Sequence, residues 1–381
     1  MRGPADLLAW RDEFPAVGRT VFLGSHTLAP ASRRTRAAIE RFMLAWETKA
    51  SAERVWFEDI IPEMRRLESM AATLIGADPA DVTLSPSVTT AIASLASAID
   101  FSGSRTQIVL SRREFPTDSL GWLAQEGRGA RVVWVDGSEA ADYAAATGQN
   151  AAVVAASRVS YLDGAITDAT EIAADARRAG ALSVIDDFHG AGVVPIDVTN
   201  VGCDALVFGP YKYLLGTSNV GLLYVRPETA AHLRPTITGW FAQRDFFAFD
   251  GSRIDWPGTA ARFALGTPAA MSIFASAAGM SIVLEVGVDR IRERSLALTG
   301  YVIERADSAQ LTVRTPREDD RRGGLVAVEV PDAKEVLDAL LDRGVIIDER
   351  HGALRVCPHF FNSEDDIDAL FQALADLGVA R

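Results

Sequence analysis

The most constraining feature of this chain is a series of short apolar runs that alternate with helical segments. Helical-looking stretches such as 168–180 separate most of the runs. Continuous apolar strands that alternate with helices predict a parallel sheet covered by helices on both faces. The runs are TQIVLS (106–111), RVVWVD (131–136), AAVVAAS (151–157), LSVID (182–186) and ALVFG (205–209).

The next apolar run, GLLYVR (221–226), breaks this alternation. Only 11 residues separate it from ALVFG, which is too few for a helical crossover between parallel strands. We therefore expect this strand to run antiparallel in an otherwise parallel sheet. The connection before it contains Lys212.

The composition allows a large core and argues against several kinds of partner. The chain has 381 residues, of which 48% are hydrophobic, and a net charge of -13, which disfavours binding to nucleic acid or to an anionic membrane. Cys203 and Cys357 form no CxxC pattern and the five histidines lack ligand spacing, so we predict no metal site. The N-terminal sequence has charges throughout and lacks the apolar core of a signal peptide, which predicts a cytoplasmic location.

The second part of the chain predicts a smaller domain. Residues 263–284 contain no charge, but the glycines, the proline and the abundant alanine indicate a helix packed between domains or subunits, not a membrane span. After it come LVAVEV (325–330), a helix at 332–343, the runs GVIID and LRVCP, and a helix at 363–377, which is an α+β pattern. We expect an N-terminal segment packed on the active site and small domain (1–30), a large domain (31–260), a linking helix (261–290) and a small C-terminal domain (291–381).

A lysine and an acid stand at neighbouring strand ends. Lys212, in FGPYKYLLG, follows Asp186, in VIDDFHGAG, by 26 residues. This pairing fits a pyridoxal 5'-phosphate (PLP) site, in which the lysine amine holds the cofactor as a Schiff base and the carboxylate keeps the pyridine nitrogen protonated. Asp187 is the competing acid, and we prefer Asp186.

Two further segments suit such a cofactor. Ser85–Thr90 precedes the helical run AIASLASAI and places amides and hydroxyls at a helix N-terminus, which is a phosphate cradle or a plain N-cap. Phe115 follows the strand TQIVLS, where an aromatic face can stack on a pyridine ring, although a core phenylalanine is the alternative.

Three polar residues are candidates for the same site. His189, three residues after Asp186, can reach the cofactor's phenolic oxygen or be structural. The hydroxyl of Tyr211 can contact phosphate or transfer a proton, or the ring can simply pack. Arg355, in LRVCPHFFN, suits bidentate recognition of a substrate carboxylate, whereas an isolated arginine is usually a surface charge.

Together these segments resemble the class V aminotransferase family of fold-type I PLP enzymes, and within it the kynureninases. The resemblance runs from about Phe22 to the C-terminus and implies a mostly parallel, seven-stranded α/β sheet with one antiparallel strand and a small C-terminal α+β domain. FPTD (115–118) and YKYL (211–214) are the kynureninase-like motifs. More widely shared are FLGSHTLAP near the start, DDFHGAGVVPID (186–197) and GWF (239–241).

The resemblance implies a role for each candidate residue. Lys212, Asp186 and His189 would be catalytic, and Arg355 and His26 would bind the substrate. The family is dimeric with sites at the interface, so Trp240 and Thr267 would reach the cofactor of the neighbouring subunit. The remaining contacts to the cofactor would come from Val88, Thr89, Phe115 and Tyr211.

We expect a PLP-dependent enzyme that acts on an L-amino acid and cleaves its side chain at the β-carbon, as a kynureninase-like hydrolase or lyase. Transamination by a class V aminotransferase is the alternative, because the same site can return the α-proton to the cofactor. A protein of this fold that has lost catalysis and serves in binding or regulation is a remote third possibility.

Overall fold

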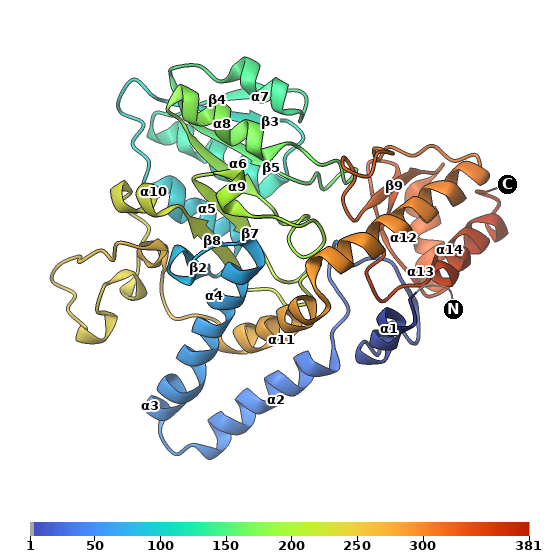
Figure 1. Cartoon of the computed structure of the whole chain (residues 1–381), viewed down its shortest axis with the longest axis horizontal. Helices are drawn as coiled ribbons and strands as arrows, with labels where there is room; N and C mark the ends of the chain where they lie inside the picture. The colour runs from blue at the N-terminus through green and yellow to red at the C-terminus, as the bar shows by residue number, and fades with distance from the viewer. Residues whose placement is uncertain (1–3, 381) are drawn as a thin grey trace.

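The computed structural model describes residues 4–380, so the outermost residues of the first and last expected segments, 1–3 and 381, lie outside the described part. A seven-stranded sheet in the order β2-β8-β7-β6-β5-β3-β4 forms its centre (Figure 1). β8 is antiparallel to both of its neighbours, whereas the other pairs are parallel, which confirms the predicted reversed strand. The strands are β2 (Val82–Ser85), β3 (Gln107–Ser111), β4 (Arg131–Val135), β5 (Ala151–Ser157), β6 (Leu182–Asp186), β7 (Ala205–Phe208) and β8 (Gly221–Val225).

Helices cover both faces of this sheet, as the continuous apolar strands predict. α4, α7, α8 and α11 contribute to one buried cluster, and α5 and α6 contribute to another on the opposite face. The helices of this part of the chain are α1 (Ala5–Leu8), α2 (Arg33–Thr48), α3 (Ala52–Val55), α4 (Ile61–Ile75), α5 (Val88–Ser97), α6 (Pro116–Leu123), α7 (Ala140–Ala146), α8 (Ala169–Ala179), α9 (Val198–Val201), α10 (Pro227–His232) and α11 (Ala270–Val286).

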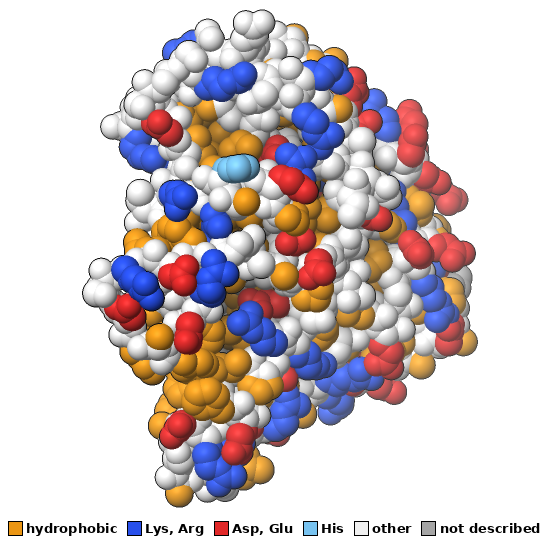
Figure 2. All heavy atoms as spheres, turned by 60° about the vertical axis from the view of Figure 1, so that its left-hand side comes forward, with side chains coloured by type: hydrophobic (Ala, Val, Ile, Leu, Met, Phe, Trp, Pro, Cys, Tyr) orange, Lys and Arg blue, Asp and Glu red, His pale blue; other side chains and the backbone are white. Residues whose placement is uncertain are grey.

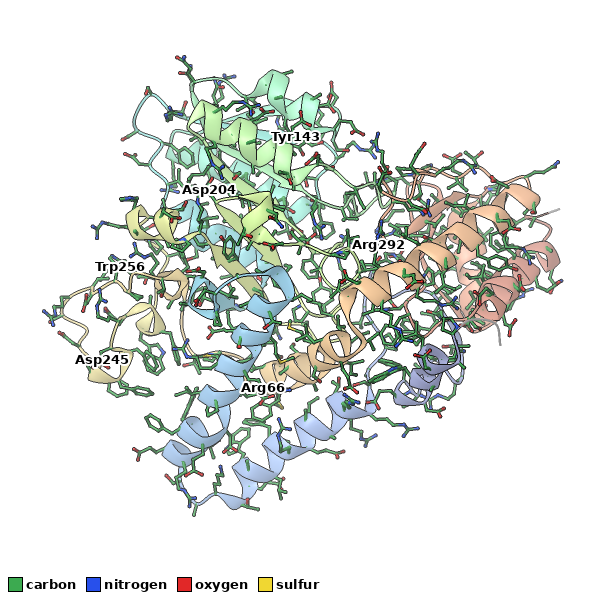
Figure 3. All side chains as sticks on the ribbon, viewed as in Figure 1. Arg66, Tyr143, Asp204, Asp245, Trp256 and Arg292 are labelled. Carbon is green, nitrogen blue, oxygen red and sulfur yellow. The ribbon has the colours of Figure 1, made fainter. Side chains whose placement is uncertain are left out.

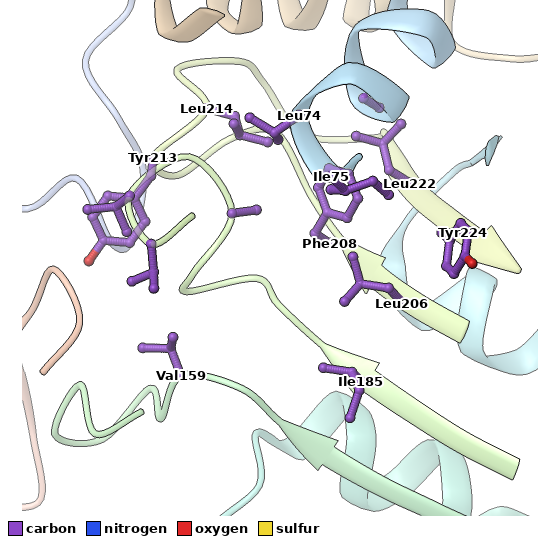
Figure 4. Close-up of a cluster of buried hydrophobic side chains, with 14 of the residues drawn as sticks. Leu74, Ile75, Val159, Ile185, Leu206, Phe208, Tyr213, Leu214, Leu222 and Tyr224 are labelled. Carbon is purple, nitrogen blue, oxygen red and sulfur yellow. The ribbon is translucent and has the colours of Figure 1, made fainter. Parts of the chain in front are cut away.

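Strand β7 shows how the two cores are divided. Successive side chains of a strand point to opposite faces of the sheet. Leu206 and Phe208 belong to the cluster that includes Ile75 of α4 (Figure 4), whereas Ala205 and Val207 belong to the cluster under α5. Since both faces of β7 are buried, the backbone that leads into the loop of Lys212 is held firmly.

The remaining elements form a second, smaller unit. β9 (Val326–Glu329), β11 (Asp348–Arg350) and β12 (Ala353–Val356) form an antiparallel sheet in the order β11-β12-β9. Buried side chains of β9 and β12 share a cluster with residues of α12 (Val288–Ser308), α13 (Ala333–Asp342) and α14 (Glu364–Asp376). From the N-terminal segment, β1 (Val21–Phe22) pairs in parallel with β10 (Val345–Ile346), which ties that segment to the small unit.

The uncharged stretch forms α11, which packs against α2 and α4. No single helix within residues 4–380 is both long and apolar enough to cross a membrane; α11 and α12 meet the combined requirement of length and composition only as a pair, and an 81° bend separates them. Eleven residues of α11 are buried, with Gly279 among them. A Cβ atom at Gly279 would lie 2.2 Å from the carbonyl oxygen of Leu215, so the helix presses directly on the loop of Lys212.

We expect Gly279→Ala to destabilise the protein by about 1–3 kcal/mol or more, because the obstacle is backbone that cannot move aside. Urea denaturation of the apoprotein measures this. Gly300→Ala in α12 is the matched control: the nearest atom to its Cβ, in the side chain of Arg322, is 3.9 Å away, so the variant should gain about 0.5–1 kcal/mol from helix propensity. Equal stability of the two variants would contradict the close approach.

A mostly irregular segment, 233–269, follows α10 and projects from the side of the large sheet (Figure 1). Asp245 and Trp256 mark its outer loops (Figure 3). Its Phe247 stacks on Phe57, which follows α3, with ring centroids 4.6 Å apart. Figure 2 brings this side forward and shows hydrophobic side chains gathered on it; Trp46, Phe57 and Phe249 are among the exposed ones.

Candidate active site

A cavity opens at the carboxyl ends of the parallel strands, where ligands bind in open α/β sheets. It contains about 540 Å³ of space that no protein atom fills. The start of α5, the connection from β3 to α6, the end of β6 and the loop from β7 to β8 all contribute to its wall. The lining residues are Ser87, Val88, Thr89, Phe115, Thr117, Asp186, Phe188, Tyr211, Lys212, Asn219 and Val220.

Lys212 is the lysine of this cavity, and its side chain is buried. Of the three lysines in the sequence, Lys49 is paired with acidic side chains near the surface and Lys334 is exposed. Burial lowers the pKa of Lys212 to about 8, although the charge of Asp186 opposes the shift. The unprotonated fraction of the amine near neutral pH is therefore much larger than for an ordinary lysine, although most of the amine still carries its proton, and this fraction is the nucleophile.

His189 lies against the lysine. Its Nε2 is 3.1 Å from Nζ of Lys212. Burial keeps the pKa of His189 well below its usual value, and the lysine's charge lowers it further. The imidazole is thus neutral and able to form one hydrogen bond through each nitrogen.

The two adjacent acids at the end of β6 have different surroundings. Asp187 is fully buried and forms a bidentate ion pair with Arg158, at 2.7 and 2.8 Å. Asp186 lines the cavity instead and accepts a hydrogen bond from the amide of Phe188 at 2.7 Å. Burial raises the pKa of Asp186 to about 7. The geometry supports the choice of Asp186 as the acid that faces a cofactor.

Asp118 is a third acid here that the sequence reasoning did not select. It is buried in the first turn of α6, and its Oδ2 has no hydrogen-bond partner in the described part of the chain. Burial raises its pKa well above the usual value, and the charge of Asp186 raises it further. Its place in FPTD was the available signal, since Phe115 of the same motif was selected.

The start of α5, where the sequence predicts a phosphate cradle, lies at the cavity wall. Ser87 is the N-cap, and its hydroxyl oxygen accepts a hydrogen bond from the amide of Thr90 at 3.1 Å. Val88 and Thr89 occupy the first turn and line the cavity, and the hydroxyl of Thr89 lies 3.1 Å from that of Thr117. Helix N-termini of this kind bind anions through free amides and the helix dipole.

Two aromatic rings flank the lysine at similar distances. The centroid of Phe115 lies 5.7 Å from Nζ of Lys212, and that of Tyr211 lies 5.9 Å away. Phe115 precedes α6 and is 43% exposed, so part of its ring remains open to stack on a ligand. Both residues therefore lie where the sequence analysis placed them, at the wall of one cavity.

Arg355 and His26 are buried and meet at Asp348, not at the cavity wall. Nε of Arg355 donates to Oδ1 of Asp348 at 2.8 Å, its Nη2 bonds the other oxygen, and its Nη1 donates to the carbonyl of Tyr161 at 2.7 Å. Nε2 of His26 is 2.8 Å from Oδ1 of Asp348. The sequence analysis did not select Asp348, which lies opposite Arg355 in the strand pair β11–β12.

Trp240 and Thr267 are not part of the cavity wall. Trp240 lines a separate hollow in the irregular segment, together with Phe246, Phe249 and Trp256. Thr267 is exposed just before α11. Within one chain, the other residues expected to contact the cofactor lie together at the cavity, whereas Trp240 and Thr267 lie apart from it.

The groups around the cavity fit PLP in their chemistry. It offers a buried amine for the aldehyde, a buried carboxyl for the ring nitrogen and a helix N-terminus for the phosphate. Asp118, buried in the first turn of α6, is a further carboxyl close enough for the charge of Asp186 to raise its pKa. Fold and site together define a PLP-dependent enzyme of fold type I.

Comparisons with known proteins give the family. The family model for class-V aminotransferases matches residues 21–370, so the chain belongs to this family, whose cofactor is PLP. It is 29% identical over 360 residues to the uncharacterized aminotransferase YcbU of Bacillus subtilis, covering 94% of each chain. It is 32% identical over 300 residues to a kynureninase of Pseudomonas fluorescens, covering 75% of this chain and 71% of the relative.

Solved structures agree on the fold. The apo structure of a cysteine desulfurase from Thermococcus onnurineus superposes with a TM-score of 0.87, covering 99% of this chain and 98% of the other. The two sequences are 21% identical, so the similarity concerns architecture. The predicted fold class is confirmed.

Proposed function

We propose that the protein cleaves the side chain of an L-amino acid at its β-carbon, like the kynureninases that it resembles. The supporting observation is that both kynureninase-like motifs meet in one cavity. FPTD supplies Phe115 and Thr117, and YKYL supplies Tyr211 and Lys212. The two motifs lie almost 100 residues apart in the sequence, and the sheet brings them together.

The residues of the cavity divide the chemical work between them. Bound PLP supplies a ring that accepts the electron pair left when the substrate loses a proton. Lys212 would hold the cofactor and would act as the base that removes the α-proton of the substrate, and its pKa of about 8 suits both roles. Asp186 keeps the ring nitrogen protonated, and His189 lies close enough to Lys212 to orient its amine.

Arg355 binds the substrate carboxylate in this proposal. A guanidinium has five N–H bonds, and Asp348 and Tyr161 take three of them. One N–H remains on each terminal nitrogen, and two such donors match the two oxygens of a carboxylate. Asp348 also offsets part of the positive charge, so the substrate meets an arginine whose orientation is already fixed.

We also propose that two copies of the chain form the working enzyme, with Trp240 and Thr267 reaching the partner's cofactor. Both residues lie outside the cavity of their own chain. The irregular segment of Trp240 exposes apolar rings such as Phe249, which is 76% exposed (Figure 2). Exposed apolar surface of this kind is typical of subunit contacts.

Transamination is the second candidate. It is favoured by the similarity to the aminotransferase YcbU, which extends over 94% of both chains. Lys212 could serve either reaction as the base that removes the α-proton. In transamination it would deliver that proton to the cofactor, whereas in side-chain cleavage the substrate would instead lose a group from its β-carbon.

A product analysis separates the two reactions. The PLP-loaded protein is incubated with L-kynurenine, L-alanine and L-cysteine derivatives, and the products are identified by mass spectrometry. We expect the side-chain fragment in an amount equal to the remaining product, which is a shortened amino acid from kynurenine and pyruvate with ammonia from a cysteine derivative, while the cofactor keeps its aldehyde form. The carboxamide of the best substrate is the control, and it should react poorly because Arg355 loses its partner. A keto acid, with conversion of the cofactor to its amine form, would replace cleavage by transamination.

A further inference from the structure

Of the three phenylalanine and tyrosine rings around the amine of Lys212, that of Phe188 lies nearest, and neither the sequence analysis nor the proposed reaction assigns it a role. Its centroid lies 4.3 Å from Nζ, nearer than Phe115 or Tyr211. Its own amide donates to Oδ1 of Asp186. A single residue therefore contacts both the lysine and the acid of the cavity.

The ring of Phe188 is seated directly on Gly209. A Cβ atom at Gly209 would lie 2.3 Å from Cζ of Phe188 and 2.6 Å from its Cε2, closer than real Cβ contacts allow. The φ angle of Gly209 lies outside the left-handed region, so the backbone conformation does not itself require glycine. Glycine is required at position 209 because the ring of Phe188 occupies the space that a side chain would need.

We propose that Phe188 and Gly209 form a matched pair that fixes the amine of Lys212 in the PLP cavity. Phe188 is the positioning residue: its ring forms the wall behind the amine. Gly209 provides the space into which that ring fits. The proposal depends on Lys212 being the lysine that binds PLP.

The surroundings of the ring support this arrangement. Tyr211, on the lysine's own loop, packs against Phe188 with centroids 4.9 Å apart, so the ring is enclosed between that loop and the backbone of Gly209. The three atoms nearest an added Cβ at Gly209 all belong to the ring of Phe188, which also lines the cavity of Lys212. The face of an aromatic ring also attracts a nearby ammonium group, which further restricts the amine.

A double-mutant cycle tests the pairing. PLP is titrated into the apoproteins of the wild type and of Gly209→Ala, Phe188→Ala and the double variant, and the Kd is read from the visible absorbance of lysine-bound PLP. We expect Gly209→Ala alone to raise the Kd about tenfold or more, because the displaced ring enters the cavity. In the Phe188→Ala background the same change should raise the Kd less than about twofold.

The outcomes separate this pairing from the function of Lys212. If Gly209→Ala binds PLP as tightly as the wild type, or if it raises the Kd as much in the Phe188→Ala background as in the wild type, the pairing is wrong. If Gly209→Ala fails to fold, the double variant must fold and bind PLP, and its failure also refutes the pairing. Borohydride reduction and peptide mapping of the wild type identify the PLP-bearing lysine independently; label on Lys49 or Lys334 would refute the role of Lys212 itself.

Discussion

Replacing Lys212 with alanine should abolish the visible absorbance of lysine-bound PLP and lower turnover to background. The reason is that Lys212 is the one lysine among the residues that line the described cavity. Its buried amine lies 3.1 Å from Nε2 of His189, and its pKa is lowered to about 8. No other side chain lining the cavity has an amine that could bind an aldehyde. Absorbance scans of the variant with added PLP, and product formation from the best substrate, measure both effects.

The sequence offers unusually clean controls for this experiment, because it has only two other lysines. Lys49 forms ion pairs with Glu58 and Asp59, and Lys334 is exposed on α13. Alanine at either position should leave the absorbance and the turnover unchanged. An unaltered spectrum in Lys212→Ala would show that PLP is attached elsewhere or is held without a covalent bond.

Much of the architecture could be predicted because the large sheet is buried on both faces. Burial on both faces produced the uninterrupted apolar runs of β3 to β8, and the short link before β8 determined its direction. The short strands β1 and β11 were harder to recognise, and the run GVIID, which contains β10, did not reveal its partner strand. β1 and β10 have two residues each and lie more than 300 residues apart, so their pairing leaves no local pattern.

The candidate site was predictable to the extent that its residues stand at strand ends. Lys212, Asp186 and Phe115 all belong to connections at one edge of the sheet, so the strand order alone brings them together. The functions of Phe188 and Asp348 depend instead on particular neighbours. Phe188 requires the space above Gly209, and Asp348 requires Arg355 on the adjacent strand, and neither relation is visible in spacing.

The choice between the two adjacent acids leads to the second large effect. Asp186→Asn should still bind PLP but lose turnover by about 100-fold or more. The neutral amide lacks the negative charge with which the carboxylate would stabilise a protonated ring nitrogen. The carboxyl of Asp186 faces the cavity, and burial raises its pKa to about 7, so a positive partner is needed to keep it ionised. Rates with the best substrate and the Kd for PLP measure the two properties separately.

Asp187→Asn is the matched control, with the opposite pattern of effects. It breaks a buried ion pair and leaves Arg158 without its partner, which should destabilise the fold by about 3–5 kcal/mol. The molecules that remain folded should keep most of their turnover, since Asp187 does not line the cavity. Thermal melting detects the first effect and rate per PLP-bound molecule detects the second. If turnover per bound PLP fell in Asp187→Asn and survived in Asp186→Asn, the acid that serves the cofactor would be Asp187, and β6 would have to present its end to the cavity in a different register.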